Sequence, residues 1–196
     1  TGHLGAAAAP MFYKPPVDAS FDIGFHQFNP YWRASDAVKF YDSRQPFTQV
    51  GYQQGTKVEV LGSFIHTQNI LPQLSIGVDM NRYRTDGFYQ RQVSKITNFD
   101  AFARYESQNG FYHANVAYVL NSLKVEENGG VENLDVFSDT SLLDKSTQPV
   151  LLDSAYVNWK SDVVFFQNAF DLGKKELVQK NDSVQYQKVV PELRLQ

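Results

Sequence analysis

Side chains with the type and spacing needed for catalysis or metal binding are scarce in this chain. Its four histidines are His3, His26, His66 and His113. None of them forms an H-x-H or HExxH pair, so the sequence does not indicate a zinc or metalloprotease site. The chain also has no cysteine, which excludes a thiol nucleophile, a Cys-ligated zinc site and a disulfide scaffold.

Other catalytic motifs are equally absent. The chain contains neither a G-x-S-x-G nucleophile turn nor a phosphate-binding glycine loop. Asp135, Asp139 and Asp144 do not have the spacing of a calcium loop. Carboxylate pairs of glycoside hydrolases come from distant strands and leave no local motif, and no pair stands out here. We therefore expect no enzyme, no catalytic residue, no cofactor and no metal.

Polar and charged side chains instead recur at every second position of several segments. Because side chains alternate between the two faces of a strand, these residues would gather on one face of a sheet. The residues predicted to do so are Asp79, Asn81, Asp100, Arg104, Glu106, His113, Asn115 and Lys160. On a soluble protein this face would be a solvated exterior. Inside a barrel it would line a wet lumen, whose nearly balanced charges predict weak ion selectivity.

The same period of two predicts an all-β chain, since no helical stripe exceeds two turns. The expected strands are 57–67, 73–83, 96–106, 111–123, 151–160, 163–172 and one that begins at 185, after two earlier strands that include 21–28. The apolar face predicted for these strands consists of Leu74, Ile76, Val78, Met80, Phe99, Tyr105, Tyr112, Val116, Tyr118 and Trp159.

Links between the expected strands alternate in length. The short links are 68–72, 108–110 and 160–162, and the longer links are 84–95, 124–150 and 173–184. Asn109-Gly110 accepts the positive φ angles of a tight turn. In an up-and-down meander all short links fall at one end, as in transmembrane barrels with short periplasmic turns and longer extracellular loops. We interpret 124–150 as a surface loop, with a constriction inside the lumen as the alternative.

Alternation alone does not decide whether the apolar face points inward or outward. Small residues on that face, such as Ala101 and Ala114, fill a soluble core poorly but are tolerated against lipid. Tyr105, Tyr112 and Trp159 lie beside the short turns, where amphipathic rings form an interfacial girdle. Both features favour a membrane barrel. A soluble β-sandwich or barrel that binds carbohydrate or a small ligand is the alternative.

Composition narrows the choice further. The formal net charge is -3, which argues against a protein that binds the phosphates of nucleic acid. No stretch approaches the roughly 18 to 20 apolar residues of a membrane-spanning helix. Transmembrane barrels remain compatible with this composition because their strands carry only short alternating segments.

Five segments, in order along the chain, resemble one known family. Residues 40–48 (FYDSRQPFT) look like the YxTKxPYT segment of the "putative porin" family of Bacteroidetes outer membranes. Residues 66–70 (HTQNI) and 74–79 (LSIGVD) are similar to its HSQNI…WNVGFDY hairpin. Residues 87–92 (GFYQRQ) and 126–130 (EENGG) match its GFYxxQ and EENGGI loops, and Leu4-Gly5 is similar to its LGNLG start. The resemblance implies an outer-membrane β-barrel that acts as a channel and is several times longer than this chain.

Together these observations predict an all-β, antiparallel up-and-down transmembrane β-barrel, or the N-terminal segment of one, in the bacterial outer membrane. Residues 1–55 are expected to hold an N-terminal segment and the first strands, and residues 56–196 the strands of a barrel that continues beyond them. The predicted function is passive diffusion of small hydrophilic solutes. The alternative within this fold is a scaffold or accessory subunit of an envelope or secretion complex. Outer-membrane lipid is the expected partner, beside envelope proteins, and the sequence does not fix the oligomeric state.

Overall fold

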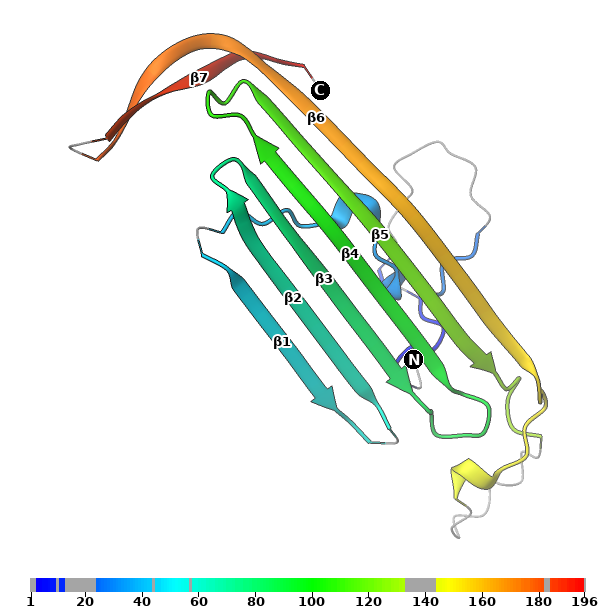
Figure 1. Ribbon diagram of the computed structural model, residues 1–196. Coiled ribbons are helices and arrows are strands. Elements are labelled where there is room, and N and C mark those ends of the chain that lie inside the picture. The colour runs from blue at the N-terminus through cyan, green and yellow to red at the C-terminus, as the bar shows by residue number, and fades with distance from the viewer. Residues whose placement is uncertain are drawn as a thin grey trace.

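The fold is a single antiparallel sheet (Figure 1). The computed structural model describes residues 3–9, 11–12, 24–43, 45–56, 58–132, 144–181 and 184–195. Its strands are β1 Phe47–Gln54, β2 Val60–Leu71, β3 Leu74–Thr85, β4 Ser94–Glu106, β5 Tyr112–Glu127, β6 Ala155–Asn181 and β7 Val184–Leu195. Within these ranges the 3-10 helices are η1 Asn29–Tyr31, η2 Ser35–Ala37 and η4 Lys145–Thr147. None of the helices in this part of the chain is long and apolar enough to cross a membrane.

The seven strands follow one another in chain order, so the predicted all-β, up-and-down architecture is confirmed. Each strand pairs antiparallel with its neighbours in sequence, and β1 and β7 are the two edges. The sheet is therefore open, as expected for part of a barrel. The strand predicted at 21–28 is not found in its described part, where 24–26 have no regular structure and 27–28 form a turn.

One strand is longer than the sequence suggested. β6 runs without a break for 27 residues, whereas two strands separated by a tight turn at 160–162 were expected. That prediction is wrong, because Lys160, Ser161 and Asp162 continue the ladder opposite β5. Three consecutive polar residues resemble a turn in sequence, but the 16 residues of β5 provide pairing partners on both sides of them.

The links alternate between the two ends of the sheet (Figure 1). Residues 72–73 and 107–111 connect strands at one end, named here the short-link end, where β6 also turns into β7. Residues 55–59, 86–93 and 128–154 connect strands at the other, the long-link end. The predicted tight turn at 108–110 is confirmed: Gly110 has a φ of 65° and its N–H donates to the Ser107 carbonyl at 2.9 Å.

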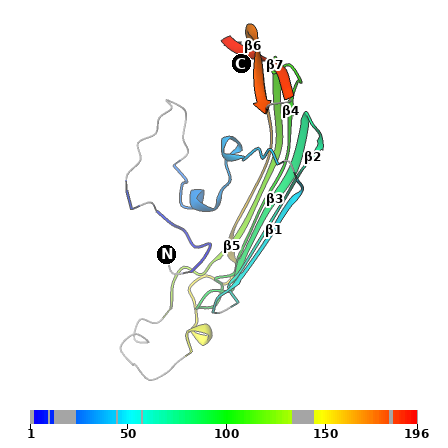
Figure 2. The ribbon, with the colours of Figure 1, turned by 90° about the vertical axis from the view of Figure 1, so that its left-hand side faces the viewer.

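The N-terminal segment, residues 24–43, crosses one face of the sheet, named here the covered face (Figure 2). Phe28 packs in a cluster with Ile96, Leu123 and Val125 of that face. Val38 forms a second cluster with Phe102, Ala117 and Val119. The chain thus supplies its own cover for the otherwise polar side of β4 and β5.

The packing beneath this segment depends on a glycine. A Cβ added at Gly77 of β3 would lie 2.3 Å from the Phe102 ring, which is far closer than carbon atoms pack. The Phe102 ring meets Phe40 at a centroid distance of 5.8 Å and Tyr41 at 5.9 Å. A glycine in β3 therefore makes room for the aromatic contact between the sheet and the N-terminal segment.

The opposite side of the sheet, named here the open face, has no such cover among the described residues. Large apolar side chains are exposed across it, including Val164 at 71% and Phe166 at 62%. At the short-link end of this face, the Tyr112 ring lies 6.2 Å from Tyr105 and 4.8 Å from Phe170. Exposed apolar surface of this extent marks a face that contacts another apolar medium or partner.

Candidate functional site

A charged cluster joins the N-terminal segment to the covered face. Arg33, in the irregular stretch between η1 and η2, hydrogen-bonds and ion-pairs with Asp100 of β4 and lies 3.3 Å from Asp79 of β3. The neighbouring Asn81 satisfies both groups of its amide when its oxygen faces the Arg33 guanidinium. Side-chain exposure is 17% for Arg33 and 3% for Asp100. One cation thus meets two carboxylates in a largely enclosed place.

Two asparagines fix the backbone around Arg33. Asn121 accepts from the Arg33 N–H at 3.1 Å and donates to the Arg33 carbonyl at 2.9 Å. Asn98 donates to the Tyr31 carbonyl at 3.0 Å and to the Asn121 side chain at 2.7 Å. The backbone of this stretch forms no strand pairing, so its N–H and C=O groups need other hydrogen-bond partners when they are buried. The two asparagine side chains provide them.

The electrostatics of the cluster favour a charged Arg33. Burial by itself would lower the pKa of Arg33, but hydrogen bonds and charges from Asp100 and Asp79 outweigh it and raise that pKa above its usual value. Arg33 therefore stays charged, and its ion pairs tie the N-terminal segment to the sheet.

Close to the anchor, the only two tryptophans of the chain meet. Trp32 and Trp159 have ring centroids 4.6 Å apart. Trp159 also packs against the cluster around Phe28. The aromatic contact and the ion cluster hold the same turn of the N-terminal segment from two sides.

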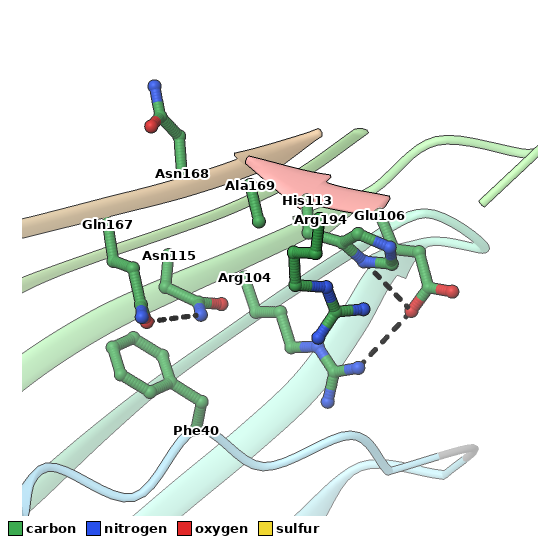
Figure 3. Close-up of a pocket in the computed structure, with 9 residues that line it drawn as sticks. All are labelled: Phe40, Arg104, Glu106, His113, Asn115, Gln167, Asn168, Ala169 and Arg194. Atoms are coloured by element: carbon green, nitrogen blue, oxygen red, sulfur yellow. Dashed lines mark hydrogen bonds and ion pairs between the residues drawn. The ribbon is translucent and has the colours of Figure 1, made fainter. Parts of the chain in front are cut away.

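A polar cavity of about 370 Å³ opens on the sheet toward the short-link end (Figure 3). Arg104 and Glu106 of β4 and His113 and Asn115 of β5 line it, together with Phe40, Arg194 and others. Arg104 contacts Glu106 at 3.2 Å, and Asn115 donates to Gln167 at 3.4 Å. The wall of the cavity thus carries side chains of both charges together with uncharged amides.

Asp171 closes the network beside the cavity. Its side chain is 4% exposed, accepts from Arg194 at 2.6 Å and lies 3.2 Å from His113. Each acid here has a basic neighbour, so the group forms paired charges without an activated nucleophile. Within the described residues, no group of three or more His, Cys, Asp or Glu side chains could hold a metal.

The register shows which of the predicted polar residues share a face. Opposite pairs such as Asn81 with Asn98 and Asp79 with Asp100 place them side by side on the covered face, and Arg104 pairs with Asn115 and Glu106 with His113. The residues brought together there are Asp79, Asn81, Asp100, Arg104, Glu106, His113 and Asn115. Lys160 is the exception: it pairs with Ser122 on the open face.

The residues predicted to form the apolar face also share one face of the sheet, with one exception. Leu74, Ile76, Val78, Met80, Phe99, Tyr105, Tyr112, Val116 and Tyr118 all lie on the open face. Trp159 lies on the covered face opposite Leu123, so its predicted place among them is wrong. Apolar side chains occur on both faces near the long-link end because Phe28 offers an apolar contact on the covered side.

The residues missed from the sequence are the pair of Asp171 and Arg194 and also Arg33, which lies outside every alternating segment. A signal for its segment was present in the apolar residues that interrupt the polar phase. Phe102 stands among Asn98, Asp100 and Arg104, and the structure buries it beneath the N-terminal segment. An apolar residue on an otherwise polar strand face indicates that another part of the chain packs over that position.

An antiparallel meander with one exposed apolar face and one polar, internally covered face is consistent with part of a transmembrane β-barrel. A family model described as "Putative porin" matches residues 1–195, so the chain belongs to that family. Membership implies a porin-type outer-membrane protein in general terms. No curated protein and no solved structure matches the chain. The Bacteroidetes source suggested by the resemblance stays a prediction.

Proposed function

We propose that the protein is an outer-membrane porin through which small hydrophilic solutes diffuse passively. In this proposal the covered face lines the lumen and the open face contacts lipid. The observation that supports it most is the division of the sheet. Seven of the predicted polar residues share the covered face, and nine of the predicted apolar residues share the open face.

The N-terminal segment would act as a constriction inside the lumen. It lies along β4 and β5, and Arg33 anchors it to Asp79 and Asp100. The polar wall of Arg104, Glu106 and Asn115 continues past it toward the short-link end. A solute would pass side chains of both signs, which favours uncharged polar molecules over either ion.

Conduction requires more strands than the seven of this sheet. About eight strands leave an interior that side chains fill, whereas about 16 to 18 leave an aqueous channel. The open edges at β1 and β7 are where further strands would pair. The test is therefore made with the full-length protein in planar bilayers, where we expect stable, water-filled conductance with weak ion selectivity.

A charge change inside the proposed lumen gives the sharper test. Glu106→Lys should shift the selectivity of the full-length channel toward anions, because Glu106 lines the polar cavity. Glu126→Lys is the matched control, since Glu126 lies opposite Tyr156 on the open face. A shift with Glu126→Lys and none with Glu106→Lys would reverse the proposed assignment of faces.

The covered face also favours a second function. A segment anchored across the sheet by ion pairs and apolar clusters can close a barrel instead of narrowing it. The protein would then be a scaffold for an envelope complex. Correctly inserted full-length protein without conductance would support the scaffold and refute passive diffusion.

A further inference from the structure

Basic side chains gather at the long-link end of the open face. They are Arg82, Arg84, Lys95, Lys124 and Lys160, and all five are exposed. Arg84, Lys95 and Lys124 stand directly opposite one another on three neighbouring strands. Arg82 and Lys160 belong to the next row of the same face. We call these five residues the basic belt.

The residues around the belt neutralise only part of it. Asp86 contacts Arg84 at 3.3 Å, and Asp162 accepts from the Tyr118 hydroxyl at 2.6 Å. Lys124 lies over the Tyr156 ring at 5.5 Å. In the described part of the chain, no carboxylate lies within ion-pair distance of Arg82, Lys95, Lys124 or Lys160. Like charges directly opposite each other destabilise a sheet. An anion bound between Arg84, Lys95 and Lys124 would reduce their mutual repulsion.

The belt lies at the border of the apolar part of the open face. The row adjoining Arg82 is apolar at Phe64, Met80, Phe99 and Leu120 and reaches Asp162 on β6. At the far end of the open face, the border consists of the rings of Tyr105, Tyr112 and Phe170. The two ends therefore differ in chemistry: one is aromatic and the other is cationic, in a chain whose formal net charge is -3.

We propose that the basic belt binds the phosphate groups of anionic lipids in the leaflet at the long-link end. Long basic side chains at the edge of an apolar surface place their charges at headgroup level, and clusters of Lys and Arg recognise phosphate-bearing headgroups. The proposal rests on the proposed function only in requiring that the open face contact lipid.

Lipid binding to the full-length protein in a neutral detergent tests the belt. Phosphatidylglycerol and phosphatidylcholine are titrated separately, and binding is followed by native mass spectrometry. The wild-type protein should prefer phosphatidylglycerol. Each basic residue near an anionic surface is worth roughly fivefold in affinity. The double variant Lys95→Gln, Lys124→Gln should therefore bind phosphatidylglycerol about thirtyfold more weakly, with phosphatidylcholine unchanged.

A matched double variant removes the same charge elsewhere. Lys39 lies on the N-terminal segment, and Lys174 pairs with Glu192 at 3.6 Å near the short-link end. Lys39→Gln, Lys174→Gln should retain wild-type lipid preference. Equal loss in both double variants would refute a local site, as would equal binding of the two lipids by the wild-type protein.

Two further measurements separate the causes of failure. Excess inorganic phosphate should not displace the bound lipid, and displacement would assign the belt to free anions and overturn the proposal. Conductance is recorded with the same preparations. A conducting protein without lipid preference refutes the belt alone, whereas a protein that folds without detergent refutes the membrane assignment of the open face first.

Discussion

Replacing Arg33 should release the N-terminal segment from the sheet. Arg33 is the cation that meets both Asp79 and Asp100, and Asp100 is 3% exposed. Arg33→Met keeps the aliphatic part of the side chain but leaves a buried carboxylate without its partner. Asp100 Oδ1 already lacks a hydrogen-bond partner, so this carboxylate has no spare contact to offset the loss.

The size of the effect follows from the burial of the pair. Removing one partner of a buried ion pair costs about 3–5 kcal/mol. Because 17% of the Arg33 side chain is exposed, water reaches the pair in part, and we expect about 3 kcal/mol, the lower end of that range. This corresponds to a shift of roughly a hundredfold in the ratio of docked to released segment.

Two assays read the docking of the segment directly. Trp32 and Trp159 are the only tryptophans, and their rings lie 4.6 Å apart. Release should therefore change the intrinsic fluorescence of Arg33→Met. Trypsin should also cleave after Lys39 in the released segment faster than in the wild-type protein.

Lys39→Met is the control for this prediction. It removes one exposed cation from the same segment without touching the cluster. The trypsin comparison uses the wild-type protein because Lys39→Met removes the cleavage site. If Arg33→Met retains the fluorescence of Lys39→Met and is cleaved after Lys39 no faster than the wild-type protein, the ion cluster does not hold the segment. The apolar contacts of Phe28 and Val38 would then be sufficient by themselves.

Three further predictions test the proposed faces and ends of the sheet. Val78→Arg, in the centre of the open face, should cost about 2–4 kcal/mol of barrel stability in lipid, measured by chemical unfolding; a soluble folded variant would contradict the membrane assignment. Protease added to intact cells should cut within 144–152 and spare the turn at 108–110, and the opposite pattern would invert the topology. Residues 3–9, which precede the N-terminal segment, also contact the sheet, because Gly5 is buried against Ser94 of β4. Burial lowers the pKa of His3 below 6.5, so residues 3–9 bind more protons when released than when docked. Docking of residues 3–9 should be strongest above pH 6.5 and weaken as the pH falls below it, as read by hydrogen exchange; His3→Gln should abolish this pH dependence.

Much of the sheet could be predicted from sequence because strand patterns are local. Leu74, Ile76, Val78 and Met80 alternate with polar residues, and side chains on a strand alternate faces. Asn109-Gly110 likewise carries its turn preference within two residues. These features depend on backbone geometry that neighbouring residues set, so β3, β4, β5 and the tight turn were located correctly.

The local sequence pattern gives a wrong prediction where pairing with a neighbouring strand determines the face of a residue or the length of a strand. Trp159 and Lys160 alternate as the sequence suggests, but their register against β5 assigns them to the faces opposite to those predicted. The polar run at 160–162 has the composition of a turn, yet the length of β5 extends the ladder through it. Pairing between strands, rather than composition, determined both outcomes.

The sequence by itself determined β3, β4 and β5, the meander and the separation of polar from apolar phases over most of the sheet, but not the uninterrupted length of β6. Only the tertiary structure brought Arg33 to Asp79 and Asp100, which are 46 and 67 positions away along the chain. No periodicity records such a contact, because the N-terminal segment forms no strand and is held by charge, amide hydrogen bonds and aromatic packing. The covered face is therefore a product of long-range contacts, whereas each strand beneath it is a product of local alternation.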